Sequence, residues 1–383
     1  MCPWFSRSFG TGGTTKPETN VSGFLFFYNV PQNTKLTFQV SILKNVLIFV
    51  LCFFANSLLK KYLCTPLQKQ YHNNKTALEA SNSPFSIKEI FFDFKEITKA
   101  GLAISVVFSS IAGFLLGIDH FSSSTWITII MLAIGGYCMV GASNAYNQII
   151  EKDIDALMDR TKNRPIPSGR MSKTTAFIIA SILTIIGIAI LYNINPRTAM
   201  FGAISIFLYT SFYTPLKTIT SLSVFVGAIP GAIPFMLGWV AANDGDFGIE
   251  AGTLFLIQFF WQFPHFWAIG WFLYDDYKKA GIFMLPSGEK DNTTALQILL
   301  YTVWLILASL LPALFPAIGL IGSRLFLSPV AAFFVFLLGV WMLVYAVKLY
   351  NARSAKAART LMLVSVMYIT LLQIVYISDK FLR

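Results

Sequence analysis

Long apolar stretches limit what this chain can fold into. From residue 99 onward, nine segments reach the length of about 20 apolar residues that a helix needs to cross the hydrocarbon core of a bilayer. They cover approximately residues 100–118, 124–150, 174–192, 198–215, 220–242, 251–274, 295–320, 325–348 and 360–378. The composition agrees, because 12% of the 383 residues are charged, whereas a soluble domain carries about twice that fraction. The sequence therefore predicts an all-α, polytopic membrane protein with nine transmembrane helices.

Basic residues are distributed unevenly over the connections between these segments. Alternate connections hold fourteen Lys and Arg residues, whereas the remaining connections and the C-terminal tail hold four. Because positive charge is retained in cytoplasmic loops, we expect the N-terminus of the bundle to be cytoplasmic and its C-terminus to be external. The net charge is +11, but no stretch forms the dense basic face of a nucleic-acid-binding module. We therefore expect a lipid environment and no nucleic-acid partner.

The first 85 residues differ from the rest. They contain a marginal apolar run at 45–59, with polar and basic sequence on both sides. The run lacks the cleavage pattern of a secretory signal, and the pattern of an organelle transit peptide is weak. We treat residues 1–85 as an N-terminal extension, either one extra membrane-associated helix or sequence upstream of the natural start, and residues 86–383 as the nine-helix domain. The weak organelle signal favours a bacterial inner membrane, and the four cysteines share no disulfide or zinc spacing.

Acidic residues are scarce, and six of the 18 lie in two short clusters at the predicted cytoplasmic ends of even-numbered segments. In the first cluster polar residues recur at every fourth position: Asn147, Glu151, Asp155 and Asp159. Residues at this spacing can share one face of a helix. Like charges there repel unless a cation lies among them, and amide and carboxylate oxygens suit Mg²⁺. The alternative is an ordinary helix end whose acids are balanced by Lys152 and the arginines that follow.

A basic loop follows this stripe directly. Its cations are Arg160, Lys162, Arg164 and Arg170, on a stretch made rigid by two prolines and a tightly turning glycine. Guanidinium groups bind phosphate oxygens bidentately, so carboxylate-held Mg²⁺ facing arginines predicts a diphosphate site. Positive-inside topology explains the sign of these charges but not the acids beside them.

The second cluster, residues 274–279, ends the sixth segment and contains Asp275 and Asp276. His265 lies eleven residues before Asp276, close to three helical turns, so the two would face the same way about 16 Å apart along the axis. An ionisable group at membrane depth is a functional candidate, although a histidine satisfied by a neighbouring helix is also possible. No second histidine lies within the predicted helices, which excludes a bis-histidine haem carrier.

Four strings of the sequence resemble one known family. They are residues 147–170, 213–217, 227–239 and 261–286. Together they are similar to the intramembrane prenyltransferases of the UbiA type, and the run WQFPHF, YDDYKKAG and MLP in the last string is similar to the branch that farnesylates haem. The resemblance extends over about residues 90–383. It implies nine helices around a central cavity, with the two acid motifs facing each other across its cytoplasmic mouth.

The resemblance also implies the participants. These are Mg²⁺, farnesyl diphosphate and haem B, with haem O as the product and a downstream haem A synthase or terminal oxidase assembly as a partner. The implied metal ligands are Asn147, Glu151, Asp155 and Asp276. The implied catalytic residues are Asn147, Lys152, Asp155, His265, Asp275 and Asp276. The implied diphosphate-binding cations are Arg160, Lys162, Arg164, Arg170, Lys217 and Lys278.

The sequence departs from the family pattern at both acid sites. Glu151 stands where many members have aspartate, which moves the carboxylate by one methylene. The second site lacks a DxxxD spacing, because Lys279 and Ala280 occupy the positions four after the two aspartates. Whether the second pair holds a metal or positions a lysine therefore stays open.

Aromatic residues are candidates for the haem or prenyl pocket. They are Tyr213, Trp261, Phe263, Phe266 and Trp267. Their faces can stabilise a developing carbocation, and they are equally suited to packing. His265 can contact haem as an axial ligand or through a propionate, or can orient a water molecule, and the sequence does not decide between these roles.

Two other functions compete with haem farnesylation. A related enzyme that prenylates a quinone or chlorophyll precursor would keep the first acid cluster but would not need the surroundings of His265. A transporter or channel would place charges throughout the membrane depth. The acids of this chain gather at one surface, which disfavours transport.

Overall fold

A computed structural model of the protein describes residues 87–320 and 322–383. The predicted N-terminal extension, residues 1–85, lies outside the described residues. Every regular element within the described range is helical, which confirms the predicted fold class. The helices are α3 (Ile87–Ile97), α4 (Ala100–Gly117), α5 (Ser123–Ile150), α6 (Lys152–Leu157), α7 (Lys173–Tyr192), α8 (Pro196–Leu208), η1 (Tyr209–Tyr213), α9 (Thr214–Leu216), α10 (Ser223–Ala242), α11 (Ile249–Phe272), α12 (Tyr274–Lys279), α13 (Asn292–Leu314), η2 (Pro316–Ile318), α14 (Pro329–Ala352) and α15 (Ala355–Leu382).

Eight helical stretches of the described chain are long and apolar enough to cross a membrane. They are α4, α5, α7, the run from α8 through α9, α10, α13, α14 and α15. Each coincides with a predicted segment. The remaining predicted segment, 251–274, the sixth along the chain, is occupied by α11, which has 24 residues and contains two glutamines and a histidine. Nine membrane spans therefore stay a prediction.

The connection between α13 and α14 is longer than the predicted segments allow. The segment predicted to end at residue 320 stops being α-helical at Leu314, and the next helix begins at Pro329 rather than at residue 325. Proline suits the first turn of a helix, and the Ser328 side chain accepts a hydrogen bond from the Ala331 amide at 3.2 Å. A cap therefore determines where α14 begins, although the residues before it are equally apolar.

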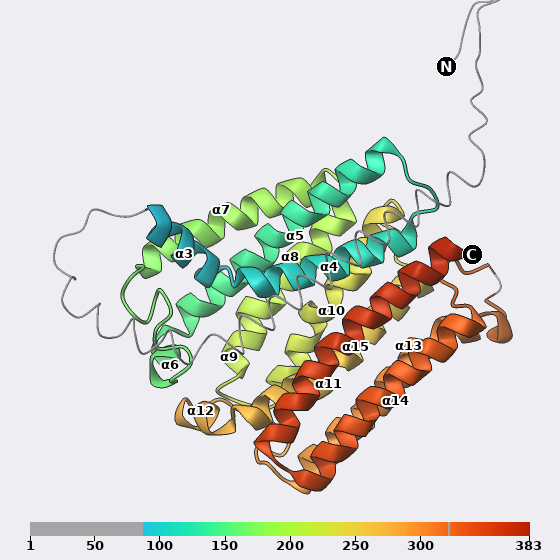
Figure 1. Cartoon of the computed structure of the whole chain (residues 1–383). Coiled ribbons are helices and arrows are strands. Elements are labelled where there is room, and N and C mark those ends of the chain that lie inside the picture. Colours follow the sequence, from blue (N-terminus) through green and yellow to red (C-terminus); the bar gives the residue numbers. More distant parts are fainter. Residues whose placement is uncertain (1–86, 321) are drawn as a thin grey trace, which may run out of the picture. The chain divides into compact units, whose positions relative to one another are not determined.

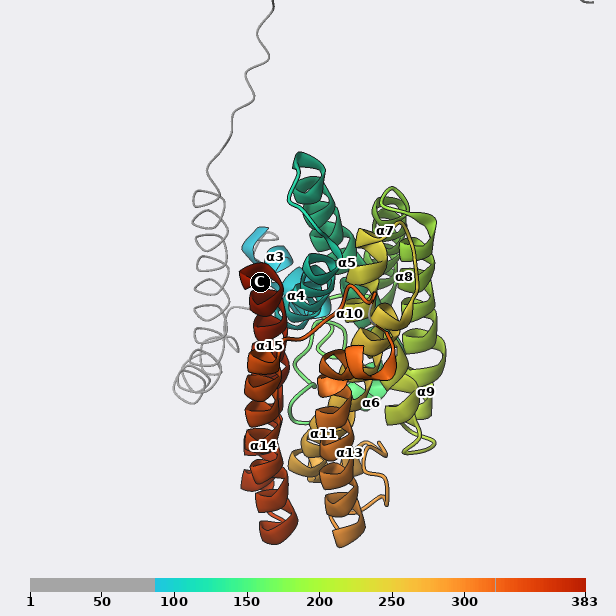
Figure 2. The same cartoon turned by 90° about the vertical axis from the view of Figure 1, so that its right-hand side faces the viewer.

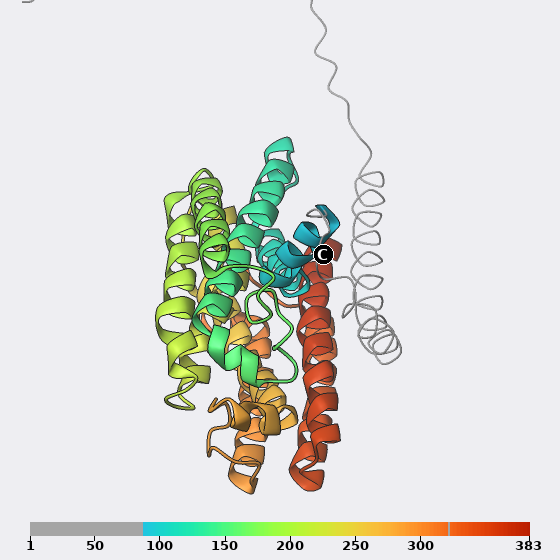
Figure 3. The same ribbon diagram turned by 90° about the vertical axis from the view of Figure 1, so that its left-hand side faces the viewer.

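The helices pack around the neighbouring pair α10 and α11. α10 packs against α4 and α8, α11 packs against α13 and α15, and α14 contacts both α13 and α15 (Figure 1). α14 and α15 lie on one flank of this array and α7 and α8 on the opposite flank (Figures 2 and 3). The short helices α6, α9 and α12 gather at the same end of the array (Figure 1). This end carries the candidate site residues.

Glycines allow α4 and α10 to approach each other at backbone distance. A Cβ atom on Gly113 would lie 1.9 Å from the Phe235 carbonyl oxygen, and one on Gly238 would lie 1.8 Å from the Ser110 carbonyl oxygen. Small residues at helix contacts are the usual device for close packing in a membrane, where lipid tails are as apolar as the side chains. The contact fixes the second half of α4 against α10 at the centre of the array.

α5 holds the turn between α3 and α4 through side-chain amides. The Asn144 amide donates to the Thr98 carbonyl at 3.1 Å, and the Gln148 amide donates to the Ile97 carbonyl at 2.9 Å. These carbonyls end α3 and would otherwise lack a partner. The next residue, Lys99, adopts the left-handed conformation with φ 47° and ψ 56°, which is uncommon for a residue with a side chain. The turn thereby redirects the chain into α4.

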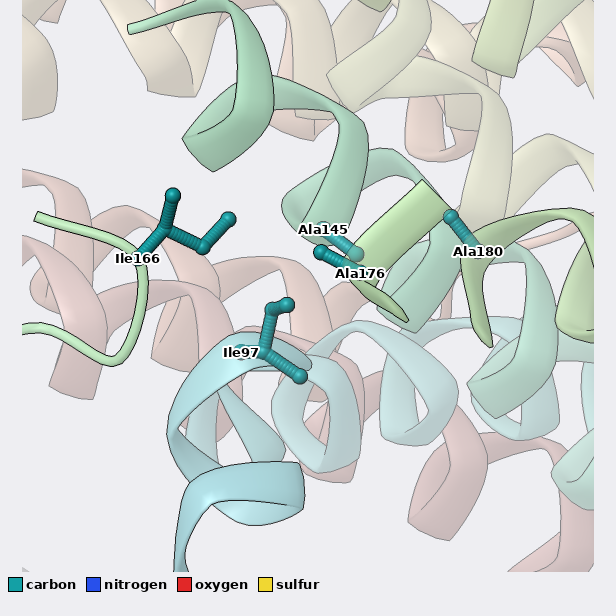
Figure 4. Packing of buried hydrophobic residues seen from close by; sticks show 5 residues of the cluster. All are labelled: Ile97, Ala145, Ile166, Ala176 and Ala180. Carbon is teal, nitrogen blue, oxygen red and sulfur yellow. The ribbon is translucent and has the colours of Figure 1, made fainter. Parts of the chain in front are cut away.

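A small apolar cluster fixes the basic loop to the helices. Ile166 of the loop and Ile97 of α3 are buried with Ala145 of α5 and with Ala176 and Ala180 of α7 (Figure 4). The alanines leave room for both isoleucines, so the loop can lie close to α5 and α7. The rigid, proline-containing loop is thereby held next to the helix that carries the first acid cluster.

Candidate active site

The first acid cluster keeps its predicted helical face over most of its length. The amides of Glu151 and Asp155 donate to the carbonyls of Asn147 and Glu151 at 2.9 and 2.7 Å, so the helical path continues from α5 into α6. The three side chains are buried, with exposed fractions of 1% for Asn147, 5% for Glu151 and 1% for Asp155. Asp159 does not share this face, because extended backbone at Met158 ends α6, and the Asp159 side chain is 66% exposed.

Each buried carboxylate is paired with a cation. Lys217 Nζ lies 2.9 Å from Glu151 Oε1, and Arg164 Nη1 lies 2.6 Å from Asp155 Oδ2. Burial alone would lower the pKa of Lys217, but the Glu151 carboxylate, together with Tyr209 and Tyr277, raises it above its ordinary value. Asp155 Oδ1 is buried and has no hydrogen-bond partner in the described part of the chain. The site therefore combines paired charges with one free carboxylate oxygen.

Lys99 joins this site, and the sequence did not identify it. Its Nζ donates to Asn147 Oδ1 at 3.3 Å, and the Asn147 amide nitrogen lies 3.4 Å from Thr214 Oγ1 of α9. Burial, followed by repulsion from Arg164 and Lys217, lowers the pKa of Lys99 to about 7. A cation at the cytoplasmic end of a first membrane span is expected from topology alone, so nothing in the sequence distinguished Lys99.

The second acid cluster lies on α12, after an interruption of the preceding helix at Leu273, where φ is −102° and ψ is 18°. The prediction that His265 and Asp276 face the same way assumed one continuous helix, and the interruption removes that assumption. Asp275 is 87% exposed and lies 3.6 Å from Lys290 Nζ. The structure thus places lysines beside the second pair of carboxylates.

Asp159 connects the two acid clusters. Its amide donates to Asp276 Oδ1 at 3.4 Å, and its carboxylate lies 3.0 Å from Lys279 Nζ and 2.7 Å from Lys162 Nζ. Hydrogen bonds from Lys162 and Lys279 lower the pKa of Asp159 to about 2. The Lys217 carbonyl also accepts a hydrogen bond from the Phe283 amide at 2.8 Å. The loops after α6, α9 and α12 are therefore joined to one another.

The other predicted cations do not contact the buried residues of the first acid cluster. Arg170 pairs with Asp93 at 2.9 Å and with Glu96 at 2.5 Å, both on α3. It therefore ties the basic loop to α3 rather than to the first acid cluster. The remaining predicted cations are partly or fully exposed to solvent: Lys152, Arg160 and Lys278.

The predicted metal ligands are brought together only in part. Nowhere among the described residues do three or more His, Cys, Asp or Glu side chains gather as a metal site, so Asp276 does not complete a cluster with Glu151 and Asp155. Asn147, Glu151 and Asp155 nevertheless present one amide and two carboxylates on one buried face. The free Asp155 Oδ1 adds a hard oxygen to this set, which fits a Mg²⁺ ion that keeps water ligands and also contacts a substrate phosphate.

Two of the predicted pocket aromatics belong to a packed cluster instead. The rings of Phe263 and Trp267 are buried, and their centroids lie 4.5 and 4.9 Å from that of Tyr301 on α13. Tyr213 is buried beside the acid site, where Lys217 Nζ lies 4.3 Å from its ring centroid. Among these three aromatics, only Tyr213 adjoins the charged residues.

Trp261, Phe266 and His265 form a separate group on α11. Trp261 stacks on His265 with ring centroids 4.6 Å apart, and the ring centroid of Phe266 lies 5.6 Å from that of His265. His265 Nδ1 lies 2.8 Å from Ser365 Oγ of α15. The sequence singled out His265 but gave no indication of its partner one hundred residues later.

An apolar pocket lies beside the part of α5 that precedes the first acid cluster. It has an empty volume of about 420 Å³ and is lined by residues of α4, α5, α7, α8 and α10. Ser143, one helical turn before Asn147, lines it together with Met139 and Gly136. None of the five predicted aromatic residues lines this pocket.

Comparison with known proteins identifies relatives over most of the chain. The UbiA prenyltransferase family matches residues 106–372. A protein named protoheme IX farnesyltransferase from Flavobacterium johnsoniae is 75% identical over 306 residues, which are 80% of this chain and 100% of the relative. Proteins of the same name from Flavobacterium psychrophilum and Cytophaga hutchinsonii are 72% identical over 306 residues and 38% identical over 292 residues. They are matched over 100% and 98% of their lengths and cover 80% and 76% of this chain.

Solved structures share the fold at low sequence identity. A digeranylgeranylglyceryl phosphate synthase has a TM-score of 0.61 and 16% identity, with 77% of this chain and 100% of that chain covered. A UbiA homologue from Archaeoglobus fulgidus, bound to GPP and Mg²⁺, has a TM-score of 0.53 and 14% identity, with 75% and 99% covered. Together with the sequence relatives, these likenesses establish that the chain belongs to the UbiA prenyltransferase family and is a membrane-embedded transferase.

Proposed function

We propose that this protein transfers the farnesyl group of farnesyl diphosphate to a vinyl group of haem B, giving haem O and diphosphate. The name of a relative that is 75% identical and matched over its whole length supports both substrates. The observation that carries the proposal is the buried pairing of Glu151 and Asp155 with Lys217 and Arg164. Carboxylates that can hold Mg²⁺ and cations that can hold phosphate occur there at one place.

Asn147, Glu151 and Asp155 are the residues that would hold Mg²⁺. When bound, Mg²⁺ supplies charge neutralisation to the departing diphosphate. Asp276 contacts the Asp159 amide and lies near Lys279. We therefore propose that the second acid cluster positions the basic groups of the loops and does not coordinate the metal directly.

The cations of the site act on the diphosphate. Lys99, Arg164 and Lys217 donate hydrogen bonds to its oxygens and stabilise the negative charge that develops as the allylic carbon–oxygen bond breaks. The vinyl group of haem then forms a bond to the farnesyl carbon. Water adds to the resulting cation beside the porphyrin and loses a proton, which completes the hydroxyethyl group. Apolar surroundings limit earlier attack of water on the farnesyl group.

A single substitution tests the assignment of the first acid cluster. Asp155→Asn keeps the size of the side chain but removes the charge, so farnesyl transfer should fall by about 10²-fold or more, while haem binding stays unchanged. Asp153→Asn is the matched control, because Asp153 lies on the exposed side of the same helix. Near wild-type turnover by folded Asp155→Asn protein would show that the metal and diphosphate assignment is wrong.

A reconstituted assay tests the substrates. The purified protein in lipid vesicles is given haem B and farnesyl diphosphate, and mass spectrometry looks for hydroxyethylfarnesyl haem with Mg²⁺ present and after chelation. We expect product only with the metal. If haem B gives no product while a quinone or chlorophyll precursor is prenylated, the protein belongs to a different branch of the family.

We also propose the cellular placement. Positive charge in alternate connections supports a bacterial inner-membrane protein whose acid site and bundle N-terminus are cytoplasmic and whose C-terminus is external. Farnesyl diphosphate would then reach the site from the cytoplasm. A haem A synthase or a terminal oxidase assembly is the expected recipient of haem O.

A further inference from the structure

The π-helical turn η1 directs Thr214 of α9 toward α5. The Thr214 amide donates to the Tyr209 carbonyl five residues earlier, so this turn contains one residue more than an α-helical turn and shifts the register of the residues that follow. Turns of this kind occur frequently at functional sites. Thr214 is 2% exposed, and Lys217, three residues later, pairs with Glu151 at 2.9 Å. The end of α9 is thus fixed beside the first acid cluster.

The single proton of the Thr214 hydroxyl is already used. A threonine hydroxyl donates one hydrogen bond and accepts through two lone pairs. Thr214 Oγ1 donates to the Tyr209 carbonyl at 2.8 Å. Toward any other neighbour this oxygen can only accept, and the neighbour that it meets is Nδ2 of Asn147 at 3.4 Å.

The two ends of the Asn147 amide therefore meet different partners. Oδ1 lies 3.3 Å from Lys99 Nζ, and a protonated lysine only donates. If the amide were reversed, its oxygen would face Thr214 Oγ1, which has no proton to give, and its NH2 group would face the Lys99 ammonium. Both hydrogen bonds would be lost in a side chain that is 1% exposed. The amide oxygen is thereby held on the side of the charged groups.

We propose that Thr214 is a positioning residue, which orients the Asn147 side chain so that its amide oxygen is available to Mg²⁺. The inference rests on the proposed function, in which Asn147, Glu151 and Asp155 hold the metal. Mg²⁺ is bound by oxygen ligands, and the NH2 group of an amide cannot replace them. Lys99 does not fix the orientation by itself, because its long flexible side chain also donates to the diphosphate. Thr214 keeps its contact with Asn147 when Lys99 turns to the substrate.

Mn²⁺ binding measured by EPR tests this role without turnover. Mn²⁺ takes the same oxygen ligands as Mg²⁺, and farnesyl thiodiphosphate, with sulfur at the bond that breaks, occupies the diphosphate site without rapid reaction. Thr214→Val keeps the branched shape but removes the hydroxyl, so the amide is free to reverse. The Kd of Mn²⁺ for protein in lipid vesicles should rise by about 10-fold to 100-fold, as is usual when a group that orients a metal ligand is lost.

Thr218→Val is the matched control. Thr218 is exposed in the loop after α9, and its hydroxyl donates to the Pro215 carbonyl at 3.2 Å. Its replacement removes a hydroxyl from the same stretch of chain without touching Asn147. The Kd of Mn²⁺ should equal that of the wild type, and a rise as large as that in Thr214→Val would overturn the inference.

A double variant separates orientation from packing. A carboxylate presents an oxygen in either orientation, so Asn147→Asp has no amide to orient. Adding Thr214→Val to Asn147→Asp should therefore leave the Kd of Mn²⁺ unchanged. If the added substitution weakens binding as much as it does in the wild-type background, Thr214 acts through packing and the inference is wrong.

Thr214→Ser keeps the test decisive if Thr214→Val does not fold. This variant retains the hydroxyl and loses one methyl group, so its affinity for Mn²⁺ should stay close to that of the wild type. A loss of about tenfold or more would assign the effect to the methyl group and overturn the role of the hydroxyl.

The outcomes also separate this inference from the proposed function. Wild-type protein that farnesylates haem and binds Mn²⁺, together with a folded Thr214→Val variant of equal affinity, removes the role of Thr214 and leaves the function intact. Wild-type protein that binds no Mn²⁺ in the presence of farnesyl thiodiphosphate removes the metal assignment of the proposed function and this inference with it.

Discussion

At the residue scale, the left-handed turn at Lys99 has the clearest functional consequence. The turn directs an ammonium group to Asn147 Oδ1 at 3.3 Å, within the site formed by Arg164 and Lys217. We expect Lys99→Ala to raise the KM for farnesyl diphosphate and to lower kcat/KM by about 10²-fold, because a preorganised charge beside the leaving group is lost. Steady-state kinetics with varied farnesyl diphosphate would measure both quantities.

Lys95→Ala is the matched control for this substitution. Lys95 is an exposed residue of α3, and its Nζ lies 5.7 Å from the Phe91 ring centroid. Its removal should leave both constants near the wild-type values. Equal effects of the two substitutions would mean that Lys99 acts only through the general positive charge of this surface. Lys99→Arg should retain part of the activity, since the charge is kept but its position changes.

At the element scale, the contact between α4 and α10 depends on Gly113. A Cβ atom at this position would lie 1.9 Å from the Phe235 carbonyl oxygen, so Gly113→Ala must push the two helices apart. We expect a loss of about 1–3 kcal/mol in the free energy of unfolding and a lower Tm in detergent. Gly101→Ala in the same helix has no atom within 4 Å of its new Cβ and should be neutral. A Gly113→Ala protein as stable as Gly101→Ala would contradict the close approach.

The link between the two acid clusters has a predictable pH dependence. Hydrogen bonds from Lys162 and then Lys279 lower the pKa of Asp159 to about 2, and the hydrogen bond to Asp159 raises the pKa of Lys279. The stability that ionised Asp159 adds to the folded state is therefore present above its ordinary pKa and is lost as the pH falls through about 2. The stability that protonated Lys279 adds is present below its ordinary pKa and is lost only at more alkaline pH. We expect the pair to persist unchanged between about pH 5 and pH 9.

Hydrogen exchange in α12 measures this link. Lys279→Met should increase exchange of the α12 amides, corrected for intrinsic rates, by the same factor throughout that pH range. Lys278→Met is the control, because the Lys278 Nζ lies 6.0 Å from the Tyr274 ring centroid and forms no link to Asp159. A Lys279→Met effect that changes strongly near neutral pH would contradict the assignment to this ion pair.

At the scale of the whole molecule, hydropathy predicted the long helices because each needs only a sufficiently long apolar run. α3 was not predicted, since 11 residues with mixed polarity give no membrane signal. The sequence predicted basic loop residues beside the first acid cluster, because the two are adjacent in the chain, and the Asp155–Arg164 pair agrees with this. The contacts of Lys99 with Asn147 and of His265 with Ser365 were not predicted, because they depend on a left-handed turn and on the packing of α11 against α15. The sequence pattern thus predicted the long helices, but it could not predict contacts that depend on how the helices pack.

The orientation of the bundle is the last feature that the charge distribution predicts. Glu289 lies exposed between α12 and α13, and Asp246 lies exposed between α10 and α11, on opposite predicted sides of the membrane. In a cysteine-free background, a membrane-impermeant maleimide should label Asp246→Cys in intact spheroplasts and Glu289→Cys only after permeabilisation. The physical reason for this expectation is that positive charge is retained on the cytoplasmic side, and the connections on that predicted side hold fourteen basic residues against four on the other. The reverse labelling would place the acid site outside, where cytoplasmic farnesyl diphosphate cannot reach Lys99, and the proposed reaction would lose its supply of substrate.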